Sequence, residues 1–250
     1  MSGPAPDTSA LHPARMGLEP LPLAAWLKPA AGDDVLLAER TRLIAAHAPD
    51  VIAAQPEAYA AIAELTALLE GRGFKLASTA SPLATLAEIG RALAEDLCIL
   101  IEPGDGGYRL TAGILCFPNR WRLNEKIGGN VLAVHGPVPD YHDQLSEAVD
   151  RFLARLKPER AYMRRNWGLA SSPDLYLPEP IPAVDPNATA GVYLRREDQG
   201  FLKLSKTSAV IFSIRTTVTP WSETPGELRA DILKTIAGLS PAWLGYKSIR

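Results

Sequence analysis

The sequence predicts an α+β fold in which an antiparallel β-sheet carries flanking helices. Three observations support this class. Helical spacing of apolar residues dominates up to about residue 97, a hairpin pattern follows, and three strand-like runs crowd together between residues 191 and 217. Strands that are segregated from helices, instead of alternating with them, favour an antiparallel sheet. We expect residues 1–30 to form an irregular arm and residues 31–250 to form a single domain with a helical N-terminal part.

Three helices are expected before the first strand. Val35 to Ala46 carries leucine and isoleucine at mixed helical spacings. Pro56 to Glu70 begins with a proline suited to a first helical turn and is followed by a glycine that can end the helix. Ser81 and Pro82 provide a cap and a first-turn proline for the third helix. Its expected inner stripe consists of four leucines: Leu83, Leu86, Leu93 and Leu97.

A β-hairpin is expected next, from apolar runs at residues 97–102 and 108–116 around a glycine-rich turn. The glycines do not form a nucleotide-binding loop, because neither G-x-G-x-x-G nor G-x-x-x-x-G-K-[ST] occurs. The remaining expected elements follow in chain order: a helix from His142 to Leu156, strands at Tyr162 to Leu169, 191–196, 199–204 and 209–217, and a helix that opens with a capping box at Thr224 to Glu227 and ends near Ala237.

Composition excludes several classes of function. An apolar fraction of 47% is enough for a core, and a net charge of −2 gives no electrostatic basis for binding nucleic acid or an acidic membrane. No run approaches about 18 apolar residues, and the first residues lack the pattern of a secretion signal, so we expect a cytoplasmic protein with no membrane span. Two cysteines, Cys98 and Cys116, lie in apolar runs and are expected to be reduced and buried. They are too few for a four-cysteine zinc or iron–sulfur site within this chain.

His135 is the histidine with the clearest candidate roles. It ends the run Val131 to Val134 and precedes Gly136 and Pro137, so it can stabilise the end of a helix. The alternative is a metal or haem ligand. Zinc would need neighbouring ligands, and no H-x-x-x-H occurs, whereas one axial histidine is enough for haem. A haem would be bound without covalent attachment, because C-x-x-C-H is absent. A serine hydrolase is disfavoured because there is no G-x-S-x-G motif.

Several arginines lie in or beside apolar segments, and two interpretations are open. They are either solvated residues in ordinary ion pairs, or inward-facing residues that need an anionic partner such as a haem propionate or Glu197. Strand alternation makes Arg215 the strongest candidate for an inward position. The arginines concerned are Arg120, Arg122, Arg164, Arg165, Arg195, Arg196 and Arg215.

The chain resembles the family of haem-dependent oxidative N-demethylase α subunits. The resemblance is carried by an ordered set of short motifs between about residues 15 and 220: Met16-Gly17-Leu18-Glu19-Pro20-Leu21, Glu95-Asp96-Leu97-Cys98, Leu115-Cys116-Phe117-Pro118-Asn119-Arg120-Trp121, Glu125-Lys126-Ile127-Gly128, Val134-His135-Gly136-Pro137-Val138-Pro139, Arg165-Asn166-Trp167, Leu194-Arg195-Arg196-Glu197-Asp198-Gln199 and Ile214-Arg215-Thr216.

The resemblance implies a PAS-like sheet that binds haem b. His135 corresponds to the family's axial histidine and is the expected iron ligand. By the same correspondence Glu197 and Arg215 are candidate catalytic residues, with Glu197 as partner of an amine. The residues Arg120, Lys126 and Arg165 stand in matching motifs and are candidate contacts of the cofactor.

The implied function is that of a monooxygenase-type oxidoreductase subunit that demethylates a small amine such as dimethylamine with O₂. Electrons would come from a separate flavin and iron–sulfur reductase subunit, which agrees with the absence of a nucleotide fingerprint in this sequence. A haem-based gas or redox sensor is the main alternative, and a haem-free binding module is another.

Overall fold

A seven-stranded antiparallel sheet organises the computed structural model, which describes residues 16–27, 32–104, 107–134, 136, 138–139, 146–188 and 190–250. The strand order is β1-β5-β6-β7-β3-β4-β2, and every neighbouring pair is antiparallel. The strands are β1 Glu19–Leu21, β2 Ile52–Ala54, β3 Asp96–Ile101, β4 Arg109–Ile114, β5 Ala161–Ala170, β6 Tyr193–Lys203 and β7 Val210–Pro220. The expected α+β class with an antiparallel sheet is confirmed. The PAS-like character stays a prediction.

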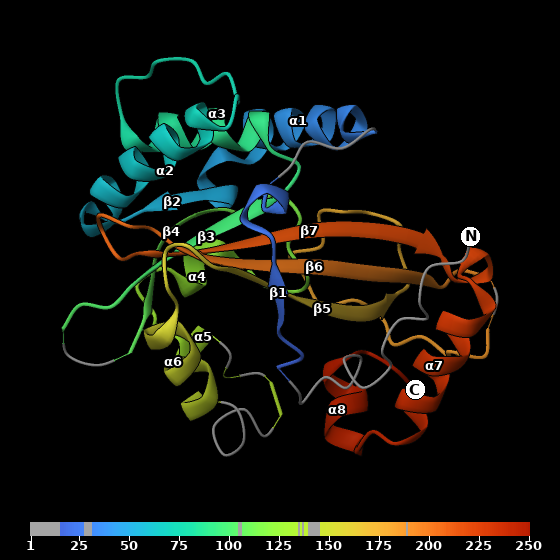
Figure 1. Cartoon of the computed structure of the whole chain (residues 1–250). Coiled ribbons are helices and arrows are strands. Elements are labelled where there is room, and N and C mark those ends of the chain that lie inside the picture. The colour runs from blue at the N-terminus through green and yellow to red at the C-terminus, as the bar shows by residue number, and fades with distance from the viewer. Residues whose placement is uncertain are drawn as a thin grey trace.

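Helices cover the sheet on both faces (Figure 1). They are α1 Asp33–Val51, α2 Tyr59–Gly71, α3 Pro82–Ala92, α4 Leu123–Lys126, α5 Val131–Val134, α6 Ser146–Arg155, α7 Gly226–Ala237 and α8 Pro241–Tyr246. In Figure 1, α1, α2 and α3 lie above the sheet, whereas α4, α5 and α6 lie below it and α7 and α8 lie near the ends of the long strands. No helix in the described part of the chain is long and apolar enough to cross a membrane.

The two faces of the sheet bury different residues of the same strand. In β3, Leu97 and Ile99 pack with the layer formed by α1, α2 and α3. Cys98 and Leu100 point the other way and pack with Leu123 of α4 and its neighbours. This alternation is the two-residue period of a strand, and it explains why β3 reads as an uninterrupted apolar run.

The expected helix boundaries are correct near caps and less so elsewhere. Ser81 caps α3, since its Oγ accepts a hydrogen bond from the Ala84 amide at 3.2 Å. The helix ends at Ala92, however, because Leu93 takes an extended conformation and the chain then enters β3. The expected inner stripe is partly wrong: Leu86 is buried in α3, but Leu83 is 47% exposed, Leu93 follows the helix and Leu97 lies in β3.

Three other expectations need correction. The runs 191–196 and 199–204 form one strand, β6, because β5 and β7 hydrogen-bond to it on both sides through its charged middle. The capping box at Thr224 does not form: its hydroxyl donates to the Pro220 carbonyl, and Pro225 precedes the first residue of α7 without a side-chain cap. Residues Glu19–Leu21, expected in an irregular arm, pair with β5 as an edge strand.

Candidate functional site

A cavity of about 460 Å³ lies on the sheet face that carries α5, α6 and α8. This volume is typical of pockets that hold small molecules or cofactors. Much of its wall is apolar and includes Leu100, Leu110, Val131, Phe152, Phe201 and Phe212. The polar part includes Asn119, Arg120, Arg164, Asn166, Glu197 and Lys247. The cavity therefore has an apolar wall and a charged end.

Strand alternation decides which residues reach the cavity. On β6, Glu197, Gln199 and Phe201 line it, while the residues between them face the other side of the sheet. The adjacent strand β5 contributes Arg164 and Asn166. The charged run that had suggested a break in β6 thus places one carboxylate on the cavity face.

Glu197 is the acidic residue at the charged end, and it is 8% exposed. Its carboxylate accepts hydrogen bonds from three side-chain amides: Gln199 Nε2 at 2.8 Å, Asn166 Nδ2 at 3.1 Å and Asn119 Nδ2 at 3.5 Å. Asn166 is its register partner across the strands. Because these donors are neutral, they fix the carboxylate without neutralising its charge.

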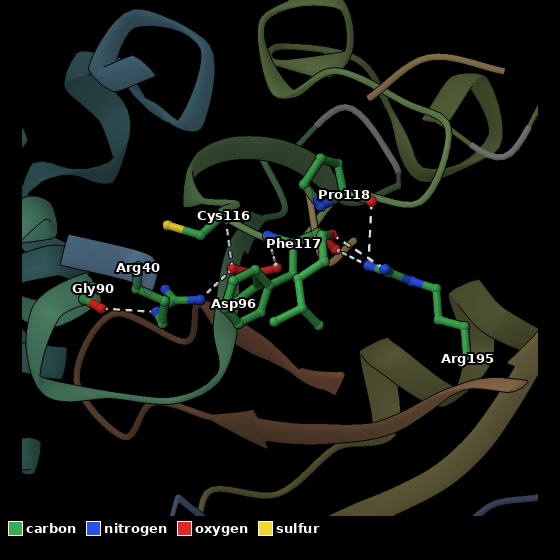
Figure 2. A network of polar contacts seen from close by, with 8 residues as sticks. Arg40, Gly90, Asp96, Cys116, Phe117, Pro118 and Arg195 are labelled. Atoms are coloured by element: carbon green, nitrogen blue, oxygen red, sulfur yellow. Dashed lines mark hydrogen bonds and ion pairs between the residues drawn. The ribbon is translucent and has the colours of Figure 1, made fainter. Parts of the chain in front are cut away.

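A buried ion pair holds the segment that leads into the site (Figure 2). Arg40 of α1 and Asp96 of β3 are both fully buried, and Arg40 Nη1 donates to Asp96 Oδ1 at 2.5 Å. The same carboxylate accepts from the amides of Cys116 at 2.7 Å and Phe117 at 2.9 Å. Arg40 also donates from Nε to the Gly90 carbonyl at 2.8 Å. A charged pair with these further hydrogen bonds is the arrangement that makes burial of both ions tolerable.

Arg195 holds the same segment from the other side. Its Nη2 donates to the carbonyls of Phe117 at 2.6 Å and Pro118 at 3.2 Å. Figure 2 shows Phe117 and Pro118 between Asp96 and Arg195. Residues 116–118 are thereby held through their amides by Asp96 and through their carbonyls by Arg195. Asn119 and Arg120, which line the cavity, follow directly.

Arg120 has a backbone conformation that is unusual for a residue with a side chain, with φ of 63°. Its amide donates to the Leu177 carbonyl at 2.6 Å. Its Nη1 donates to the Tyr246 carbonyl at 3.0 Å and to Ser248 Oγ at 2.6 Å, and its Nε donates to Asn119 Oδ1 at 3.2 Å. Burial lowers the pKa of this guanidinium. Strained residues of this kind cluster at functional sites.

Lys247 follows α8 and is 3% exposed. Its Nζ donates to the Trp167 carbonyl at 2.5 Å and lies 4.5 Å from the centroid of that indole ring. Burial lowers the pKa of the amine to about 7. Sequence reasoning missed this residue, because Tyr-Lys-Ser after a short helix carries no motif or periodicity that singles it out.

The structure brings together three of the residues expected from the sequence: Glu197, Arg120 and Lys126 all line the cavity. His135 lies outside the described residues. Val131 and Val138, which flank it in the chain, both line the cavity.

Two expected residues lie elsewhere. Arg165 is on the opposite face of β5, where Nη1 lies 3.6 Å from Glu19 and Nε lies 3.7 Å from Asp198. Arg215 points toward α1 and pairs with Asp33 and, at 2.9 Å, with Glu95. Each is one position out of phase with cavity residues of its strand, and each has carboxylate partners within the chain.

The cysteines are free and buried, as expected. Burial raises the pKa of both thiols, Cys98 and Cys116, to about 12. Among the described residues no group of three or more histidine, cysteine, aspartate or glutamate side chains could hold a metal ion.

Comparison with known proteins adds one match. The model of a family described as haem-dependent oxidative N-demethylase, alpha subunit-like, matches residues 65–250. The matched region begins within α2 and includes the cavity-lining strands β3 to β7. No curated protein matches the chain.

Proposed function

The chain belongs to the haem-dependent oxidative N-demethylase, alpha subunit-like family, and we propose that it is the haem-binding subunit of an oxidoreductase that demethylates a small amine. The observation that carries this proposal is the cavity, whose described lining combines an apolar wall with one carboxylate and several cations. Dimethylamine is the proposed example of the substrate, and O₂ the proposed oxidant.

The cavity residues fit a haem. A porphyrin needs an apolar slot, which Leu100, Val131 and Phe212 help to form. Its propionates need cations, and Lys126 and Arg164 lie in the same wall. His135 is the residue that we propose would bind the haem iron, supported by Val131 and Val138, which lie on either side of it in the sequence and line the cavity. Haem b, when bound, supplies the redox chemistry of O₂ that amino-acid side chains lack.

The chain's own residues bind and orient the substrate. A protonated amine can donate to the carboxylate of Glu197, whose direction is set by its three amide donors. Apolar residues such as Phe201 and Ile214 provide a surface for a methyl group and exclude water. The ion pairs of Arg165 and Arg215 support a structural role for these two arginines in place of the catalytic or cofactor role expected from the sequence.

The proposed reaction also needs a source of electrons. These 250 residues contain two cysteines, too few for a four-cysteine iron–sulfur cluster, and no dinucleotide-binding fingerprint. We therefore propose a separate flavin and iron–sulfur reductase subunit as the partner, in keeping with the alpha-subunit description of the family.

The test is an absorption spectrum of the full chain purified after growth with a haem precursor. We expect a Soret band that shifts or disappears in His135→Ala. The adjacent arginines give a matched pair: Arg164→Leu should weaken haem binding, and Arg165→Leu should not, because the two side chains lie on opposite faces of β5. A wild-type chain that takes up no haem even on reconstitution would overturn the proposal. Haem binding without amine-dependent oxygen uptake, in the presence of a reductase, would instead favour a sensor.

A further inference from the structure

Among the described residues, more buried cations than carboxylates lie at or beside the charged end of the cavity. Arg120, Arg195 and Lys247 are all buried or nearly so, and the charge of Glu197 acts on the pKa of each. Among the ion pairs of the described residues, none within 4.0 Å involves any of these three cations. Among the described residues that line the cavity, Glu197 is the one carboxylate, so the cations near it outnumber the carboxylates.

In the described part of the chain, these cations donate their hydrogen bonds to neutral acceptors. The acceptors are backbone carbonyls, one hydroxyl and one side-chain amide, at Asn119, Phe117, Pro118, Trp167, Asp174, Leu175, Tyr246 and Ser248. Burying a charge that is solvated only by neutral dipoles costs free energy, and buried charges in proteins are normally paired with an opposite charge. The cost is visible here, since burial lowers the pKa of all three groups.

Two of the three cations can reach a ligand. Arg195 donates from Nη1 and Nη2 to four carbonyls and does not line the cavity. Arg120 and Lys247 do line it. Within the described part of the chain, Arg120 Nη2 makes no hydrogen bond, and Lys247 Nζ donates one of its hydrogens to the Trp167 carbonyl.

Arg120 also keeps a left-handed backbone conformation that residues with a side chain disfavour. Its φ of 63° is retained while its amide and side chain are tied to residues around 177 and 246–248. Such conformations persist where the surroundings fix them, and here they fix a guanidinium at the cavity wall.

We propose that Arg120 and Lys247 form a carboxylate-binding subsite beside Glu197, so that the substrate is an N-methylated amino acid whose amine meets Glu197 and whose carboxylate meets the two cations. The proposal rests on the proposed function for the identity of the amine site. Lys126 and Arg164, the cations assigned above to the haem propionates, are different residues of the same cavity lining. A zwitterion supplies the anion that the buried cations lack, whereas dimethylamine adds a further positive charge.

The test compares ligands on the haem-loaded full chain by calorimetry and by shifts of the Soret band. N,N-dimethylglycine should bind about tenfold or more tightly than dimethylamine, which is the scale of one charge-assisted hydrogen bond. Acetate, which lacks the amine, should bind more weakly than dimethylglycine. Lys247→Met should remove the preference for dimethylglycine, and Lys247→Arg should retain much of it. Lys203→Met, at the end of β6 and outside the cavity lining, is the control and should leave the preference unchanged.

The outcomes separate this inference from the proposed function. If haem binds and dimethylglycine binds no better than dimethylamine, the inference is overturned and the haem function stands. The inference is also overturned if the chain takes up haem and dimethylglycine then binds the haem-free form but not the haem-loaded form, since a propionate would then occupy the subsite. If the chain takes up no haem but binds dimethylglycine with the expected effect of Lys247→Met, the proposed function fails and the subsite stands.

Discussion

Replacing Asp96 with asparagine tests how the central segment is held. The carboxylate accepts from Arg40 at 2.5 Å and from the amides of Cys116 and Phe117 at 2.7 and 2.9 Å. Asparagine has nearly the same shape but only one accepting oxygen. Its amide nitrogen would face one of these donors, and Arg40 would keep its charge in a fully buried position without a close anion.

The expected loss is large relative to the stability of a domain. Removing one partner of a buried ion pair costs about 3–5 kcal/mol, against a total of about 5–15 kcal/mol. For a chain of this size each kcal/mol corresponds to about 2–4 °C. We therefore expect Asp96→Asn to lower the Tm by about 6–20 °C, measured by calorimetry or circular dichroism, and to lower the urea midpoint without changing the slope.

The neighbouring acid Glu39 provides the control. It pairs with Arg42 on the exposed side of α1, where a surface pair contributes about 0–1 kcal/mol. Glu39→Gln should therefore shift the Tm by no more than about 4 °C. If Asp96→Asn unfolds at the same temperature as this control, the buried pair does not stabilise the segment and the reasoning is refuted.

Three further predictions follow from packing and charge. Gly200→Ala should destabilise the protein by about 1–3 kcal/mol, because a Cβ there would lie 2.5 Å from Ser213 Oγ, whereas Gly168→Ala, with nothing within 4 Å, should be tolerated in the same urea titration. Both cysteines should resist iodoacetamide at pH 8 in the folded protein and react after unfolding, as read by mass spectrometry, since thiols with a pKa of about 12 hold almost no thiolate. Lys247 has a pKa of about 7 in the folded protein, below its ordinary 10.5. Between these two pH values the unfolded chain binds more protons at this residue, so its contribution to wild-type stability should rise with pH. The stability of Lys247→Met relative to wild type should accordingly be highest near pH 6 and fall by pH 9; a difference that is flat with pH would contradict the lowered pKa.

Local signals predicted much of the fold. The Ser81 cap, the apolar runs on either side of residues 103–107 and the long helical spacings depend on neighbours in sequence, and they correspond to α3, the β3–β4 hairpin, α1 and α2. The errors arose where distant partners decide. The charged middle of β6 is a poor strand by propensity, and it is a strand because β5 and β7 pair with it along its length.

The site was predictable only in part, for a related reason. Motifs identified Glu197 and Arg120, but the choice between Arg164 and Arg165 requires the phase of β5 relative to the cavity. A shift of one residue moves a side chain to the other face of the sheet. Lys247 could not be predicted as a site residue from the sequence, because its contact with Trp167 joins residues 80 positions apart.

The stability of the fold and the geometry of the site are linked through one short segment. Asp96 binds its amides and Arg195 its carbonyls, and Arg120 follows two residues after Pro118 with a left-handed backbone. A conformation of that kind persists only while its surroundings determine it. Loss of the Asp96 hydrogen bonds would loosen residues 116–118 and let Arg120 relax toward ordinary backbone angles. The Arg120 guanidinium would then be held less firmly at the cavity wall. Arg40, which never reaches the cavity, thus helps to hold the residue that does.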